Sequence, residues 1–210
     1  MAFAEQAFFD EVATELKVDA VQLRLDMLAK AKDNTLEEPL SYEPEKLKGV
    51  IELAAEKSDW KNKGDRHLGF CTYYSHNTYV AEVAEIVMDN NEAVVKKVYC
   101  AIDCGIVINP KAALNQVEGG IIDGIGHAMY GDFSFDSGRG TSDNFNQFRL
   151  IRISEVPEIE VHFIETNNDP TGLGEPTLPP AGGAIANAIY SATGKRFYKQ
   201  PFIKELNLLG

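Results

Sequence analysis

Residues 69–103 read GFCTYYSHNTYVAEVAEIVMDNNEAVVKKVYCAID, and this stretch decides the fold class. Apolar and polar residues alternate along it, a period that is typical of strands with one buried face. The pattern predicts three strands, at Gly69–Ser75, Tyr79–Met88 and Ala93–Asp103, and a turn at Asp89-Asn90-Asn91 between the last two. We therefore expect a β-meander at the centre of the molecule.

The residues before the meander have helical spacing. Apolar residues recur every three or four positions over 4–16 and again over 21–28, and Asp19 stands where it can cap the second helix. A third helix opens with Pro44, which suits the first turn. The polar stretch at 33–43 before it is either a linker or a surface loop.

The residues after the meander mix both periods. Asn109-Pro110 signals the start of a helix that reaches about residue 129. Gly131–Phe135 and Ile159–Glu165 fit further strands, and a last helix is expected over Ala181–Thr193. Helices gathered first and strands later predict an α+β fold with a mixed or antiparallel sheet. We expect a helical segment at 1–60 and an α+β segment at 61–210.

The charge of the chain limits its partners. A formal net charge of −12 argues against nucleic acid and anionic membrane surfaces, because both would be repelled. No apolar run approaches the roughly 20 residues that a membrane span needs, and the N-terminus lacks a positively charged signal-peptide start. We expect a soluble polypeptide with no membrane insertion and no export signal of its own.

The sequence offers no pattern for a metal held by side chains. Cys71, Cys100 and Cys104 lack CxxC spacing, and we expect reduced thiols in a core. The four histidines show no pair at i,i+4 and no HxH spacing. Our prediction for protein metal ligands is therefore none.

Residues 169–183, DPTGLGEPTLPPAGG, form the most unusual segment, with four of the nine prolines of the chain. Prolines and glycines restrict the path of the backbone, so Glu175 between Gly174 and Pro176 is held at low entropic cost. The helix that follows is apolar nearly all round, and we expect it to bury the loop and desolvate Glu175, as suits a general base or acid. The alternative is a solvated Glu175 in a turn that glycine and proline merely shape.

The second unusual segment is Gln116–Gly126, which places four glycines, at 119, 120, 124 and 126, inside one helical pattern. Each glycine costs about 0.5–1 kcal/mol relative to alanine in a helix, so something must approach this helix closely. The candidates are another helix or a ligand, with Gln116 offering amide donors and an acceptor one turn away.

Several segments, taken in order, resemble the C-terminal part of the molybdopterin-binding large subunit of the xanthine dehydrogenase and aldehyde oxidase family, most of all the isoquinoline 1-oxidoreductase beta-subunit type. They are Cys100–Gly105, Asn109-Pro110, Gln116–Gly120, Asp143–Phe145, Pro170–Pro176, and Ala186–Ile189 with Gly194–Arg196. Each motif is weak alone, and six in the right order make a specific match. On this basis we expect residues 1–210 to be a partial molybdopterin-binding domain.

The resemblance implies roles for single residues. Glu175 matches the glutamate that, in the family, deprotonates a molybdenum-bound hydroxide, which then attacks an aldehyde or an N-heterocycle. Gln116 matches a residue that hydrogen-bonds the pterin, and Gly119, Gly120, Gly172 and Gly174 are expected to lie against the cofactor. The molybdenum is held chiefly by the pterin's own dithiolene sulfurs, in a cofactor that some members carry as the cytosine dinucleotide.

The resemblance also implies what the chain needs from elsewhere. The family's upstream cofactor loops, the cysteines for two [2Fe–2S] clusters and a flavin domain are not in this sequence. We expect the chain to bind no cofactor alone and to act with an N-terminal half of the large subunit and a [2Fe–2S] small subunit on a small substrate, in cytoplasm or periplasm. Exposed apolar surface would favour self-association. The alternatives are a non-catalytic remnant, a stand-alone domain without cofactor, or a carrier of free pterin.

Overall fold

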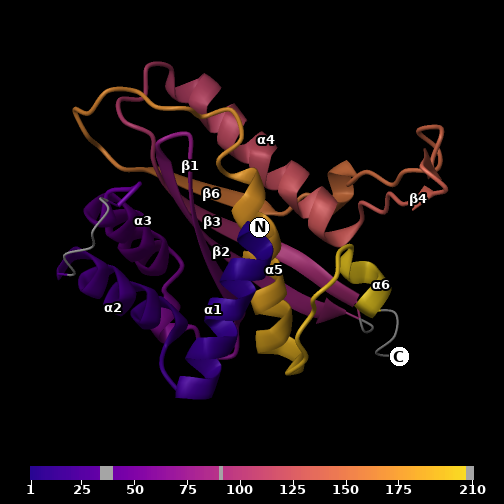
Figure 1. The fold of residues 1–210 in the computed structure, drawn as a ribbon, viewed down its shortest axis with the longest axis horizontal. Coiled ribbons are helices and arrows are strands. Elements are labelled where there is room, and N and C mark those ends of the chain that lie inside the picture. Colours follow the sequence, from indigo (N-terminus) through magenta and orange to yellow (C-terminus); the bar gives the residue numbers. More distant parts are fainter. Residues whose placement is uncertain (34–39, 90–91, 207–210) are drawn as a thin grey trace.

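The computed structural model describes residues 1–33, 40–89 and 92–206. Its centre is a four-stranded sheet in the order β1-β2-β3-β6 (Figure 1). The strands are β1 His67–Ser75, β2 Thr78–Asp89, β3 Glu92–Asp103 and β6 Glu158–Phe163. β1, β2 and β3 pair antiparallel, and β6 pairs parallel with β3. The predicted meander and mixed sheet are confirmed, while the turn residues Asn90 and Asn91 lie outside the described residues.

A two-residue turn joins β1 to β2. His76 and Asn77 both have positive φ, 55° and 60°, as a tight turn that continues the right-handed twist of its strands requires. The Tyr74 hydroxyl donates to Asn77 Oδ1 at 2.9 Å and steadies the turn. This turn places the His76 side chain at the end of the sheet where the candidate site lies.

Six helices surround the sheet in the described part of the chain. They are α1 Ala2–Leu16, α2 Ala20–Asp33, α3 Pro44–Lys57, α4 Pro110–Met129, α5 Leu178–Thr193 and α6 Phe202–Leu206, with short 3-10 turns at Trp60–Asn62 and Ile153–Glu155. The predicted caps are present: Asp19 Oδ1 accepts from the backbone of Val21 and Gln22 at 3.0 Å, and Asn109 Oδ1 accepts from that of Ala112 at 3.1 Å.

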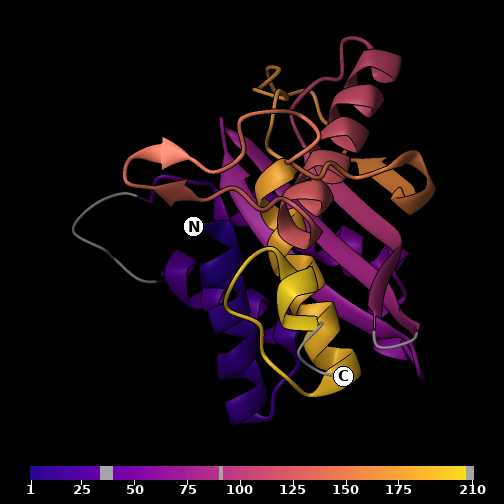
Figure 2. The ribbon, with the colours of Figure 1, turned by 90° about the vertical axis from the view of Figure 1, so that its right-hand side faces the viewer.

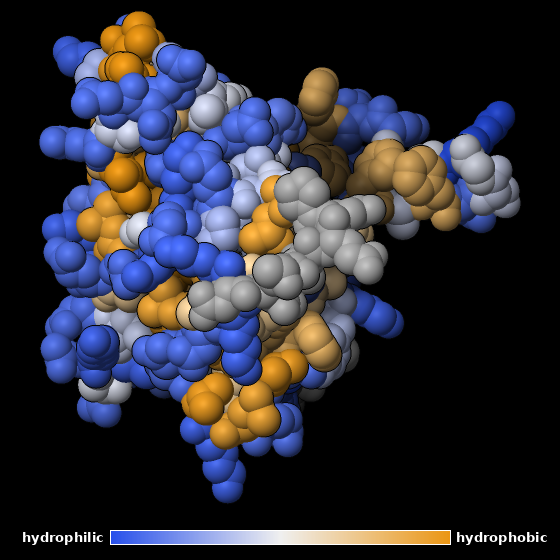
Figure 3. All heavy atoms as spheres, turned by 60° about the vertical axis from the view of Figure 1, so that its left-hand side comes forward, coloured by the Kyte–Doolittle hydropathy of each residue, from blue (hydrophilic) through white to orange (hydrophobic). Residues whose placement is uncertain are grey.

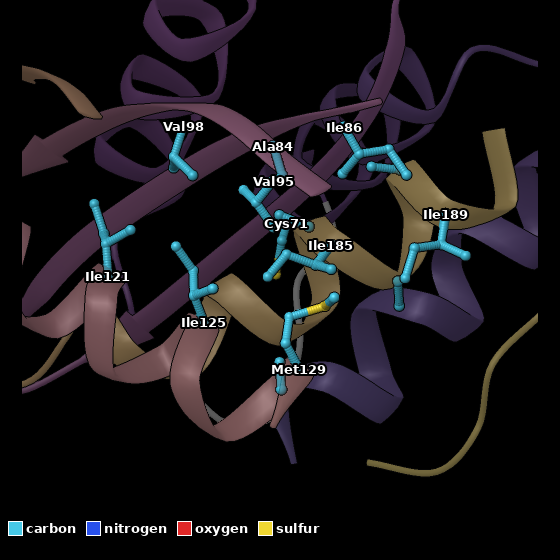
Figure 4. Packing of buried hydrophobic residues seen from close by; sticks show 14 of the residues in the cluster. Cys71, Ala84, Ile86, Val95, Val98, Ile121, Ile125, Met129, Ile185 and Ile189 are labelled. Carbon is cyan, nitrogen blue, oxygen red and sulfur yellow. The ribbon is translucent and has the colours of Figure 1, made fainter. Parts of the chain in front are cut away.

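The sheet is the middle of three layers (Figures 1 and 2). On one face, α4 and α5 bury side chains against the strands (Figure 4), among them Ile121, Ile125, Ile185, Val98 and Ala84. On the other face, α2 and α3 pack through a second cluster that includes Val50, Ile51, Phe70, Val83 and Trp60. The two faces follow from the alternation of side chains along each strand, and all three cysteines are free and buried as expected.

The segment after α4 differs from the prediction. The expected strand Gly131–Phe135 is wrong: Gly131 closes α4 by donating to the Gly126 carbonyl, and only Phe135–Asp136 (β4) pairs, with Arg139–Gly140 (β5). Most of residues 131–153, which we call the arm, extends from the body (Figure 1) and carries apolar side chains at the surface (Figure 3), while Ile151 packs back on α4. Phe145 is 92% exposed, so it does not pack in a core. A strand needs a neighbour to satisfy its backbone, and most of the arm has none in the described structure.

Among the described helices, none is both long and apolar enough to span a bilayer.

Candidate functional site

The loop that carries Glu175 connects β6 to α5 and is tied to the end of the sheet. The Thr171 backbone N–H donates to the Cys104 carbonyl at 2.9 Å, and the Gly172 N–H donates to the His76 carbonyl at 3.1 Å. The Thr78 hydroxyl donates to the Gly172 carbonyl at 2.6 Å. These bonds join the loop to both the end of β3 and the β1–β2 turn, so its backbone path is fixed, as the prolines and glycines predict.

α5 begins directly against α4, and two of the α4 glycines make this possible. A Cβ at Gly120 would lie 2.3 Å from the Thr177 hydroxyl, and one at Gly124 would lie 2.5 Å from the Leu178 carbonyl oxygen. The same Thr177 hydroxyl donates to the Val117 carbonyl at 3.1 Å. The close neighbour of Gly120 and Gly124 is therefore the start of α5.

The two unusual segments meet at the surface. Gln116 Nε2 lies 3.5 Å from the Gly174 carbonyl oxygen, at the limit of a hydrogen bond. Gly119 is on the same face of α4, three residues on, and a Cβ added at Gly119 or Gly174 would meet nothing within 4 Å. Gly172 is different, because a Cβ there would lie 2.7 Å from His76 Cβ. Gln116, Gly119 and Gly174 thus border open space, whereas a side chain added at Gly120 or Gly172 would collide with neighbouring parts of the chain.

A shallow hollow adjoins this meeting point. Its volume is about 240 Å³, and Gln116 lines it together with Asn109 and Ala113 of the same helix region. Pro170 and Leu173 supply the opposite wall. Residues from both unusual segments therefore form one concave surface.

Glu175 itself is exposed. Its side chain retains 69% of its accessible surface, so the expected desolvation of this carboxylate is wrong for the chain alone. Pro176 and Thr177 are buried, and the run of buried residues in α5 begins at Pro180, so the apolar helix covers residues after Glu175 and leaves the Glu175 side chain outside.

His76 faces Glu175, a contact that the sequence did not predict. His76 Nε2 lies 3.8 Å from Glu175 Oε1, and the other ring nitrogen, Nδ1, is 2.7 Å from the Ser75 hydroxyl oxygen. Histidine spacing in the sequence does not reveal His76, because its partner Glu175 is distant in sequence. The available signal was its place in a tight turn between two strands, which brings a side chain to the sheet end.

No group of three or more His, Cys, Asp or Glu in the described ranges could hold a metal ion. Cys71 and Cys100 are buried in the core, where burial raises the pKa of both thiols well above the ordinary value. These thiols stay protonated and are poor metal ligands. The described side chains therefore offer hydrogen bonds, a carboxylate and an imidazole.

Comparison with known proteins identifies the family of the chain. The model of the molybdopterin cofactor-binding domain matches residues 4–157, well over half of the chain. The chain belongs to this family. The match to the molybdopterin cofactor-binding domain includes Gln116, Gly119 and Gly120, and it ends before the loop of Glu175.

Among curated proteins, this molybdopterin cofactor-binding domain is 32% identical to the beta subunit of the isoquinoline 1-oxidoreductase of Brevundimonas diminuta, over 95% of this chain and 25% of that protein. It is 27% identical to a nicotinate dehydrogenase subunit of Pseudomonas putida, over 97% of this chain and 18% of that protein. The chain thus spans about a quarter or less of the length of these relatives. The resemblance read from the motifs is confirmed.

Solved structures agree on the fold of this molybdopterin cofactor-binding domain. The aldehyde oxidoreductase from Desulfovibrio desulfuricans is 26% identical with a TM-score of 0.50, over 57% of this chain and 14% of that one. The quinoline 2-oxidoreductase from Pseudomonas putida, 22% identical with a TM-score of 0.55 over 63% of this chain and 18% of that one, shares the fold. The α+β prediction is confirmed.

Proposed function

We propose that this chain is part of the molybdopterin-binding subunit of a molybdenum hydroxylase and supplies its general base, Glu175, and a pterin-binding amide, Gln116. The observation that carries the proposal is the meeting of the two segments, with Gln116 Nε2 3.5 Å from the Gly174 carbonyl, next to Glu175. A base and a cofactor-binding amide must act on one ligand, so their segments must share a surface.

The residues present suit the molybdenum cofactor. Gln116 is an exposed amide that both donates and accepts, as a pterin ring requires. The open space over Gly119 and Gly174 admits a ligand against the backbone. A cofactor that brings sulfur ligands for its own metal needs no metal ligands from these side chains. We extend the proposal to Gly120 and Gly172 as backbone flanks of the cofactor, which is molybdopterin or its cytosine dinucleotide.

When bound, the cofactor supplies the acceptor for the two electrons of hydroxylation. The chain's own contribution is a proton acceptor at the Glu175 carboxylate, held by the tied loop. His76, 3.8 Å from Glu175 Oε1, positions that carboxylate. At 69% exposure the carboxylate is open to solvent, and water competes with a ligand for its oxygens. The site therefore needs another surface to cover Glu175 and exclude water.

The surface that covers Glu175 must come from partner segments or subunits. We propose that further large-subunit sequence of the family covers Glu175, that a [2Fe–2S] small subunit carries electrons away, and that the substrate is a small aldehyde or N-heterocycle. The isolated chain is proposed to be inactive and to self-associate through the arm, where Phe135, Phe145 and Ile153 are exposed.

A second candidate is a folded domain that binds no cofactor. Two observations favour it: Glu175 is hydrated, and Gly120 and Gly124 are explained by packing against α5. The two candidates make opposite predictions about the molybdenum content of the assembled complex.

Elemental analysis separates them. We expect no molybdenum in the isolated chain and close to one atom per complex when it is purified with the rest of the large subunit and the iron–sulfur subunit. Gln116→Ala should lower the molybdenum content of the complex, while Gln22→Ala, an exposed glutamine on α2, should not. Stoichiometric molybdenum in the isolated chain would overturn the proposal that its site is incomplete. A molybdenum-free complex would establish the second candidate, a domain that binds no cofactor.

A further inference from the structure

A second hollow lies on the other side of the molecule, among α1, α2, α3 and β1. Its volume is about 330 Å³, within the range of small-molecule sites. Most of its wall is apolar or aromatic, with Phe9, Met27, Tyr42 and Leu47 among the lining residues. It shares no lining residue with the hollow beside Gln116.

The polar end of this hollow is a buried arginine. Arg24 is only 4% exposed. Its Nε donates to Gln6 Oε1 at 2.9 Å, its Nη1 to the Ala20 carbonyl at 2.7 Å and its Nη2 to the Gln6 carbonyl at 3.1 Å. All three acceptors are neutral. The guanidinium also lies 5.4 Å from the centre of the Phe70 ring.

Among the described side chains, Arg24 makes no direct salt bridge with an Asp or Glu. Of the nearby acids, Asp10 and Asp19 are engaged elsewhere, and Glu5 is exposed on the wall of the hollow. Asp10 pairs with Arg196 at 2.6 Å, and Asp19 accepts from the Trp60 indole at 2.8 Å while capping α2. Burial lowers the pKa of Arg24, yet a guanidinium keeps its proton in proteins, so the charge is buried without a carboxylate in direct contact.

Two N–H groups of the Arg24 guanidinium have no acceptor among the described residues. Each Nη nitrogen carries two hydrogens, and the described structure supplies one acceptor for each. One N–H on Nη1 and one on Nη2 are left over, and two guanidinium N–H groups are what a carboxylate binds in the bidentate mode. A ligand carboxylate there would supply acceptors for both N–H groups and a negative charge in direct contact with Arg24.

We propose that this hollow binds a small monocarboxylate with an apolar or aromatic body, its carboxylate on Arg24 and its body among Phe9, Met27, Tyr42 and Leu47. The exposed carboxylate of Glu5 also lines the hollow, and together with the net charge of −12 it disfavours phosphates and other multiply charged anions. The proposal is independent of any role of Glu175.

Calorimetric titration of the purified chain with sodium benzoate tests the proposal, in about 150 mM NaCl to screen unspecific attraction. Benzamide, which has the same ring without the charge, is the matched ligand control. We expect saturable benzoate binding with a Kd of about 1 mM or tighter, as a ligand of this size allows, and benzamide at least tenfold weaker. Absence of saturable binding, or equal binding of benzamide, would overturn it.

Two variants locate the site. Leu47→Trp fills the hollow and should weaken benzoate binding at least tenfold, while Leu150→Trp, on the exposed arm outside the hollow, should leave it unchanged. Arg24→Lys keeps the positive charge but loses the paired N–H donors of the guanidinium, and it should weaken benzoate binding at least fivefold. If Arg24→Lys does not fold, the benzamide comparison and Leu47→Trp still decide. Unchanged affinity in a folded Leu47→Trp protein would place the ligand elsewhere and refute the assignment.

Discussion

Glu82 should make the stability of this chain fall as the pH rises. It sits in the middle of β2 with an exposure of 0%, and its neighbours across the sheet are Cys71 on β1 and Cys100 on β3. Neither carboxyl oxygen has a hydrogen-bond partner in the described structure. Burial therefore raises the pKa of Glu82 well above its ordinary value of 4.5.

The sign of the effect follows from proton binding. Above pH 4.5 the unfolded chain releases the Glu82 proton, while the folded chain keeps it until the raised pKa is reached. The folded state then binds one proton more, so the free energy of unfolding drops by up to about 1.4 kcal/mol per pH unit in this window. Between pH 5.5 and pH 7.5 the loss is at most about 2.7 kcal/mol.

Glu82→Gln keeps the shape of the side chain and removes the carboxyl group that titrates. Urea unfolding of both proteins at pH 5.5 and pH 7.5 gives the difference in the free energy of unfolding, and we expect it to shift in favour of the variant by about 1–2.7 kcal/mol at the higher pH. Glu165→Gln, in an exposed segment, should show no such shift. A difference that stays constant within about 0.5 kcal/mol between the two pH values would refute the protonated, unpartnered carboxyl.

The other predictions concern packing, capping and the site. Gly124→Ala should destabilise the chain by about 1–3 kcal/mol, because its Cβ would lie 2.5 Å from the Leu178 carbonyl oxygen, whereas Gly119→Ala should be neutral or stabilising; thermal unfolding measures both. Asp19→Ala should cost about 1–3 kcal/mol in urea unfolding, since it removes a cap and the acceptor of Trp60. His76→Ala should lower the turnover of an assembled complex by about fivefold or less, because an exposed pair is weak.

Local patterns made the helices and the meander predictable. Asp19 and Asn109 cap their helices through atoms two or three residues away, and the strands at 67–103 pair with their neighbours in sequence. The prediction of a strand at 131–135 was wrong because a strand depends on a partner strand, and the arm provides one only for Phe135–Asp136.

Contacts between distant segments were not predictable. The exposure of Glu175 and its contact with His76 depend on how a loop crosses the sheet end, which no periodicity encodes. The sequence does contain two charged residues at positions where the apolar pattern predicts burial. Glu82 occupies an inward position between Val80 and Ala84, and Arg24 occupies the buried stripe of α2 with Val21 and Leu28. A charged residue at a core position is therefore as informative as a motif.

The most direct test of the proposed function is the turnover of Glu175→Gln in the molybdenum-loaded complex, compared with Glu165→Gln. We expect Glu175→Gln to keep the fold and the molybdenum content and to lose roughly 100-fold to 10,000-fold in turnover, because it removes a general base without changing its shape. Glu165→Gln should retain full turnover. Unimpaired turnover of Glu175→Gln at full molybdenum loading would remove Glu175 from the mechanism and contradict the central claim.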